Sequence, residues 1–140
     1  MQKHENYKVQ MNRLKKAIDA KFYLEAVFIE YAIIEDRFDS AICHSGVIND
    51  GKFASLNAKL NKMANIAREK KSLACKYFNQ EIFERVKLWK DERNRIIHAL
   101  MKQSLTTEKL RVLAEEGQAI VKHLCSITTS YNRKLTNQNK

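Results

Sequence analysis

The sequence predicts an all-α fold, an antiparallel helical bundle of about five helices. The chain has 140 residues, no proline and only three glycines, so residues that interrupt helices are rare. Apolar residues recur at spacings of three and four, which is typical of amphipathic helices packed around one core. No repeat or low-complexity linker divides the chain, and we therefore expect a single domain over residues 1–140.

The apolar periodicity predicts five helical segments, taken in chain order. They cover residues of about 9–20, 22–45, 53–71, 73–102 and 107–135. Gly46 and the turn at Asn49–Gly51 favour the end of the second segment, because these residue types tolerate a positive φ. The last segment follows Thr106 and Thr107, a pair of residues suited to cap a helix.

Three of the segments have a simple apolar stripe. The first has Met11, Leu14 and Ile18; the third has Leu56, Leu60, Met63 and Ala67; the last has Leu110, Leu113, Gly117, Ile120, Leu124, Ile127 and Tyr131. The last stripe alternates spacings of three and four, as the seam of a helical bundle does. Gly117 lies on this seam and would permit a close helix approach or a kink. We expect the second, fourth and fifth segments to form the centre of the bundle.

The other two segments each carry one charge on an apolar stripe. The fourth segment places Ile82, Val86, Trp89, Ile96 and Leu100 within about 40° of one direction. Arg93 lies about 20° from the centre of that stripe. The second segment has the stripe Leu24, Phe28, Tyr31, Phe38 and Ile42, and Glu35 fills the gap within it. Because a charge on a buried face needs a partner, we expect Glu35 and Arg93 to lie within salt-bridge distance. Such a pair would fix helix register, hold the guanidinium at a cleft, or do both.

A second apolar edge on residues 22–45 points to an oligomer. Ala26, Ile29 and Ile33 lie roughly opposite the main stripe of this segment. A helix that is apolar on two sides is central in the bundle or part of a subunit interface, and a homodimer contact is our expectation.

Charge and composition restrict the class of partner. The net charge is +10, and residues 52–103 hold thirteen Lys/Arg against five Asp/Glu, a balance of +8. Such a basic region suggests an anionic partner, nucleic acid first, although a solvated basic face is the alternative. Three widely spaced cysteines, the lack of an apolar leader and the lack of a long apolar run predict a soluble protein of the cytoplasm, with no membrane partner.

The segment DERNRIIH at residues 91–98 is the most informative part of the chain. Arg93, Asn94 and Arg95 precede His98 within five positions. The other three histidines have no such cluster of polar and basic residues beside them and are interpreted as structural. No arrangement of histidines with cysteines or carboxylates has metal-ligand spacing, so we expect neither a metal nor a cofactor.

The string Arg93-Asn94-Arg95-Ile96-Ile97-His98 resembles the R-x(4–6)-H motif of HEPN domains, in which a polar residue often follows the arginine. The resemblance implies a helical domain of this size and a metal-independent endoribonuclease, of a kind that often acts as a toxin or phage-defence effector. It implies a homodimer in which both motifs meet in one cleft, and a separate antitoxin protein. Arg93 and His98 would be the catalytic pair, Asn94 would orient them, and Glu35 would be the supporting carboxylate.

The chemistry of these side chains is consistent with RNA cleavage. RNA supplies its own nucleophile, an imidazole can move a proton near neutral pH, and a guanidinium can bind phosphate oxygens. Lys90, Arg95 and Lys102 would bind flanking phosphates, or are ordinary surface charges. Two alternatives stay open. One is a non-catalytic HEPN-like module that binds a nucleotide or partner, and the other is a basic helical adaptor that binds nucleic acid.

Overall fold

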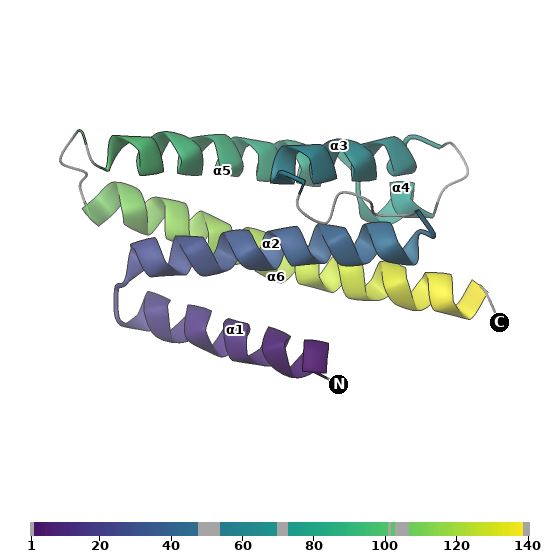
Figure 1. Ribbon diagram of the computed structural model, residues 1–140, viewed down its shortest axis with the longest axis horizontal. Helices are drawn as coiled ribbons and strands as arrows, with labels where there is room; N and C mark the ends of the chain where they lie inside the picture. The colour runs from purple at the N-terminus through teal and green to yellow at the C-terminus, as the bar shows by residue number, and fades with distance from the viewer. Residues whose placement is uncertain (1, 48–53, 70–72, 101, 103–106, 139–140) are drawn as a thin grey trace. The chain divides into compact units, whose positions relative to one another are not determined.

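The computed structural model describes residues 2–47, 54–69, 73–100, 102 and 107–138. These residues form an all-α helical bundle without strands, as the sequence predicts (Figure 1). The helices are α1 (Gln2–Asp19), α2 (Tyr23–His44), α3 (Leu56–Ala67), α4 (Ala74–Tyr77), α5 (Gln80–Ala99) and α6 (Thr107–Gln138). In the part of the chain that is described, no helix combines the length and the apolar character that crossing a membrane requires.

The chain divides into two compact units. The first unit consists of Met1–Ile33 and Leu88–Val121, and the second consists of Ile34–Lys87 and Lys122–Lys140. The helices α2, α5 and α6 contribute residues to both units. The expectation of one domain over residues 1–140 therefore stays a prediction.

The expected fourth helix is two helices in the structure. Phe78 has φ −106° and ψ 77°, which ends α4. The Asn79 side chain then accepts a hydrogen bond from the backbone N–H of Ile82 at 3.0 Å, and so caps the start of α5. Periodicity did not reveal this break, because a four-residue helix is too short to show a period of its own. The turn at Asn49–Gly51 and the cap residue Thr106 lie outside the described residues.

Two helix ends depend on left-handed backbone conformations. After α1, Lys21 has φ 65°, its N–H bonds to Ile18 O at 3.1 Å, and the N–H of Phe22 bonds to Ala17 O at 2.8 Å. This pair of bonds is a Schellman motif, and it turns the chain so that α2 runs opposite to α1 (Figure 1). After α2, Gly46 has φ 80°, which confirms the expected stop at that glycine.

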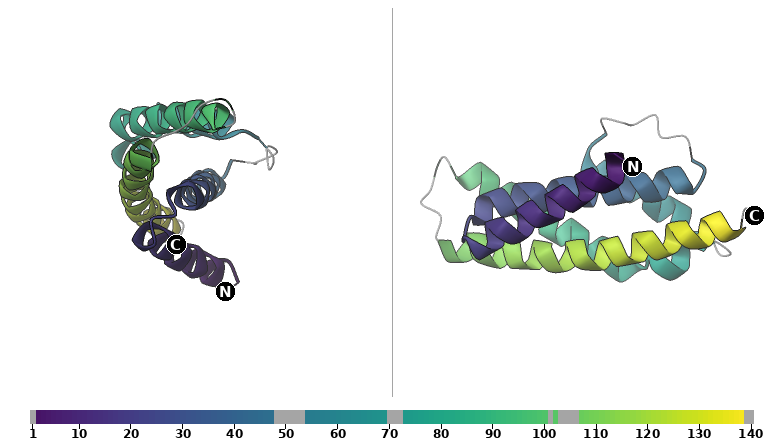
Figure 2. Two further views of the ribbon diagram at one scale, coloured as in Figure 1. Left: turned by 90° about the vertical axis from the view of Figure 1, so that its left-hand side faces the viewer. Right: turned by 90° about the horizontal axis from the view of Figure 1, so that it is seen from below.

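In the first unit, the core joins α1, α2, α5 and α6. Trp89 on α5 is 3% exposed, and its indole N–H donates to the backbone oxygen of Leu113 on α6 at 2.9 Å. This bond satisfies a buried donor and joins two helices that run in opposite directions (Figures 1 and 2). Ile96 is buried on the same side of α5 as Trp89, and Leu14 of α1 is also buried. The expected stripe of α5 is thus confirmed, with Leu100 only half-buried at its end.

In the second unit, aromatic side chains dominate the core. The rings of Phe38 and Phe78 lie 6.1 Å apart, and Tyr131 of α6 meets Phe78 edge to face at 5.4 Å. Every member of the predicted α3 stripe is buried, namely Leu56, Leu60, Met63 and Ala67. The Ser55 side chain accepts from the N–H of Ala58 and starts α3 there.

The buried face of α2 differs from the predicted stripe. It consists of Ala26, Val27, Glu30, Ile33, Ile34, Phe38, Ser40, Ala41 and Ile42. Phe28, expected in the core, is 49% exposed, and Tyr31 and Glu35 are half-buried. The stripe was therefore wrong in its first half. Ala26 and Ile33, expected to face a second subunit, are buried within the single chain and present no free surface.

Candidate functional site

Arg93 lies on α5 in the first unit, with its guanidinium between aromatic rings of α2. The guanidinium carbon lies 4.1 Å from the ring centre of Tyr31 and 5.5 Å from that of Phe28. Phe28 and Tyr31 are three residues apart and so share a face of α2. Cation–π contacts of this kind contribute about 0.5–2 kcal/mol, increasing as water is excluded. These aromatic rings thus offset part of the cost of placing this charge on the stripe.

Asn94 fixes the orientation of the guanidinium. Nη1 of Arg93 donates to Oδ1 of Asn94 at 2.9 Å. The Nε atom of Arg93 is buried and has no hydrogen-bond partner among the described residues. A buried donor without a partner is costly, about 1–3 kcal/mol, and it is a reason to examine the group for function.

His98 lies in the last turn of α5 and is exposed. It follows Asn94 by four residues, so the two side chains are neighbours on the surface of the helix. The helical repeat separates His98 from Arg93 by about 140° around the axis. Within one chain, α5 therefore presents a half-buried, oriented guanidinium on one side and a solvent-accessible imidazole on another.

The three predicted phosphate-binding residues lie in different environments. Lys90 is only 8% exposed, and its ammonium pairs with the neighbouring Asp91 at 3.2 Å. Arg95 is exposed but binds Glu92 through both a 3.1 Å and a 2.5 Å contact. Lys102 is exposed. Of the three, Lys102 and Arg95 are accessible to a large anion, and Lys90 is mostly covered.

Glu35 belongs to the second unit, where it binds a lysine. Nζ of Lys59 lies 3.0 Å from Oε2 of Glu35 and 3.0 Å from Oδ2 of Asp39. Burial acts to lower the pKa of Lys59, but the hydrogen bonds that its ammonium donates to Asp39 and Glu35 raise this pKa above its usual value. Because Glu35 and Arg93 belong to different units, their pairing stays a prediction, and Lys59 is the partner of Glu35 within its own unit.

Glu30 is the charged residue that sequence reasoning missed. It is fully buried in the first unit, and neither carboxyl oxygen has a hydrogen-bond partner among the described residues. Burial raises the pKa of Glu30 from 4.5 to about 9, so the group is a neutral acid at physiological pH. The signal was present in the sequence, because Glu30 lies four residues after Ala26 and three before Ile33, on the edge read as apolar.

Gly117 makes room for the Glu30 carboxyl. A Cβ atom at position 117 would lie 2.1 Å from Oε1 of Glu30 and 2.9 Å from Cζ2 of Trp89. Both distances are shorter than a carbon atom tolerates, so the glycine permits the close approach of two side chains. The sequence predicted a close helix approach or a kink at Gly117, whereas the structure shows that the missing side chain makes room for a buried acid beside an indole.

Among the described residues, no three His, Cys, Asp or Glu side chains gather in a way that would bind a metal ion.

Comparison of the chain with protein-family models, curated proteins and solved structures finds no match.

Proposed function

We propose that this protein is a metal-independent ribonuclease that uses Arg93, Asn94 and His98. The observation that carries the proposal is the guanidinium of Arg93, held between Tyr31 and Asn94 on the helix that also presents an exposed imidazole. An oriented guanidinium loses less entropy when it binds an anion than a free one does.

The proposed reaction uses only these side chains and the RNA. An imidazole removes the proton of the 2′-hydroxyl, and the 2′-oxygen attacks the adjacent phosphorus. The bond from phosphorus to the 5′-oxygen breaks, and that oxygen takes a proton from an acid. The products are a 2′,3′-cyclic phosphate and a 5′-hydroxyl. The guanidinium of Arg93 binds the phosphate oxygens while charge builds on them, and Asn94 keeps it in place.

A dimer completes this proposal, because the reaction needs both an acid and a base and α5 offers one imidazole per chain. His98 and Arg93 also diverge around the helix axis, so His98 of a second copy would complement Arg93. The exposed apolar side chains Phe22, Phe28 and Leu88 of the first unit are available to such a contact. Lys102 and Arg95 would bind flanking phosphates, and Arg95 would leave its ion pair with Glu92 to do so. Lys90 would contribute less to phosphate binding, because its side chain is mostly buried.

The biological setting is part of the proposal through the resemblance to HEPN domains. In this setting the enzyme acts in the cytoplasm as a toxin or phage-defence effector. A separate antitoxin protein restrains it.

The test measures cleavage of a labelled single-stranded RNA in excess EDTA. The parent chain is expected to cut the RNA and leave a cyclic phosphate end. Arg93→Ala and His98→Ala are expected to reduce the rate by about a hundredfold or more, since oriented proton transfer and charge stabilisation each contribute factors of this size. Arg93→Lys is expected to recover little, because an ammonium lacks the planar pair of donors.

Matched controls are His123→Ala and Arg133→Ala, which remove an exposed histidine and an exposed arginine of α6. Both are expected to cut at the parent rate, and circular dichroism checks that every variant folds. Equal rates for the parent and for folded Arg93→Ala and His98→Ala would contradict the proposal.

A binding module is the second candidate, favoured by the partial enclosure of Arg93 under Tyr31 and Phe28. It predicts that the parent retains RNA in a gel-shift assay, that this retention depends on Arg93, and that the RNA stays intact.

A further inference from the structure

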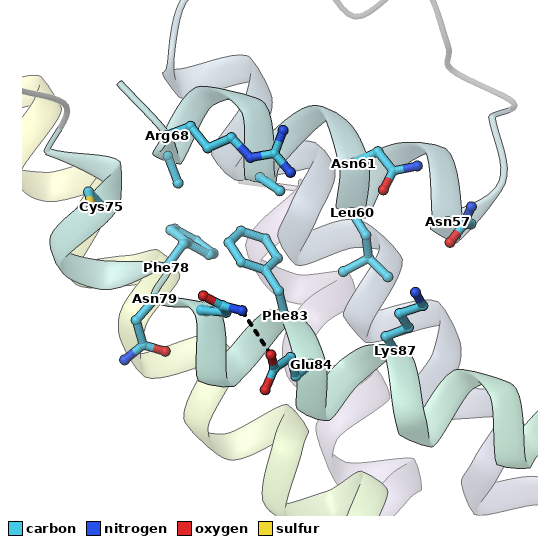
Figure 3. Close-up of a pocket in the computed structure, with 13 residues that line it drawn as sticks. Asn57, Leu60, Asn61, Arg68, Cys75, Phe78, Asn79, Phe83, Glu84 and Lys87 are labelled. Atoms are coloured by element: carbon cyan, nitrogen blue, oxygen red, sulfur yellow. Dashed lines mark hydrogen bonds between the residues drawn. The ribbon is translucent and has the colours of Figure 1, made fainter. Parts of the chain in front are cut away.

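A pocket of about 710 Å³ lies in the second unit, between α3, the short α4 and the start of α5 (Figure 3). This volume is in the range of small-molecule sites. Its apolar lining comes from Leu60, Ala64 and Ala67 of α3 and from Phe78 and Phe83. The centres of the two phenyl rings lie 6.3 Å apart, and the rings tilt by 32°. Phe78 is buried, whereas Phe83 is only half-buried.

Two cations flank this apolar surface. Arg68 extends from α3 toward the space beside Phe83, and Lys87 extends from α5 toward α3 (Figure 3). Neither is in an ion pair with a described residue. The guanidinium of Arg68 donates to the side-chain oxygen of Asn65 at 3.2 Å. Glu84 is the single carboxylate in the lining, and its Oε1 accepts a hydrogen bond from Gln80 at 2.9 Å. The pocket therefore combines aromatic walls with cations that have no counterion in the described structure.

We propose that this pocket binds a small molecule with a flat apolar ring system and one anionic group. The rings of Phe78 and Phe83 would contact the ring system, and Arg68 and Lys87 would bind the anion. The pocket is lined wholly by residues of the second unit, so this proposal does not rest on the ribonuclease proposal.

The test uses two fluorescent probes that share a ring system and differ in charge. Anilinonaphthalene sulfonate is the anion, and N-phenyl-naphthylamine is its uncharged counterpart. We expect the folded parent chain to bind both probes, and the anion more tightly. In the double variant Arg68→Ala/Lys87→Ala, the dissociation constant of the anion is expected to rise about tenfold, because a charge-assisted contact is lost. The dissociation constant of the neutral probe is expected to change less than about twofold.

Two further variants give the test its controls. Arg133→Ala/Lys134→Ala removes the same two charges from exposed positions on α6 and is expected to leave both constants unchanged. Ala64→Phe fills the pocket from a half-buried position on α3 and is expected to weaken the binding of both probes. The proposal is overturned if the parent binds neither probe or if Ala64→Phe binds the probes as tightly as the parent does. It is also overturned if both double variants raise the dissociation constant of the anion by the same factor.

Discussion

The buried carboxyl of Glu30 makes the stability of this protein dependent on pH. In the folded chain the pKa of Glu30 is about 9, whereas in the unfolded chain it returns to about 4.5. Between these values the folded state binds a proton that the unfolded state releases. The free energy of unfolding therefore falls as pH rises through this window, by about 1.4 kcal/mol per pH unit.

Between pH 6 and pH 8 the free energy of unfolding falls by about 2.7 kcal/mol. For a chain of this length this loss corresponds to a fall in Tm of roughly 10 °C. Glu30→Gln keeps the shape of the side chain but does not titrate. Between pH 6 and pH 8 the Tm of this variant is therefore expected to fall by roughly 10 °C less than the Tm of the parent.

The assay is thermal unfolding followed by circular dichroism at pH 6 and pH 8 for the parent, Glu30→Gln and Glu25→Gln. Glu25 is an exposed glutamate of α2, and its substitution is expected to leave the pH dependence of the parent unchanged. Histidine titration affects all three chains alike and cancels in the comparison. If the parent and Glu30→Gln lose the same number of degrees between the two pH values, then Glu30 is not a buried neutral acid and the reasoning fails.

Two further substitutions test close contacts and backbone strain. Gly117→Ala is expected to lower the free energy of unfolding by about 2 kcal/mol, because the new methyl group would overlap Glu30 and outweigh the gain in helix propensity; urea unfolding measures it, and a change below the error of that measurement would contradict the packing. Lys21→Gly is expected to raise the free energy of unfolding by about 0.5–1 kcal/mol, because Lys21 has φ 65° and glycine adopts that conformation without strain. The same unfolding assay checks it, and a loss of stability would count against the Schellman geometry after α1.

Much of the local structure was predictable from the sequence. Four apolar residues at spacings of four, three and four predicted every buried apolar residue of α3, because one amphipathic stripe leaves one way to pack a helix. Gly46 predicted the end of α2, since few other residues adopt its φ of 80°. The stripe of α5 also predicted that Arg93 would be partly buried.

The orientation of α2 was not predictable in the same way. Its sequence has apolar residues on two sides, and spacing alone does not say which side meets α5 and α6. Packing in the first unit selects the side of Ala26 and Ile33, which leaves Phe28 half-exposed. This choice turns Glu30 into the core and Glu35 toward Lys59, and it places Tyr31 under the guanidinium of Arg93. The expected salt bridge between Glu35 and Arg93 stays a prediction, because the two residues belong to different units.

The sequence by itself determined that the chain is helical and, for α2 and α6, about where the helix begins and ends, because propensity, capping and turn chemistry act between residues a few positions apart. It also singled out the Arg93–His98 segment, whose spacing along one helix needs no other part of the chain. Only the tertiary structure decided which charges have partners. Whether a carboxyl becomes a buried neutral acid, as Glu30 does, or forms an ion pair with a lysine, as Glu35 does, depends on the helix that packs against it. That neighbouring helix is distant in the sequence.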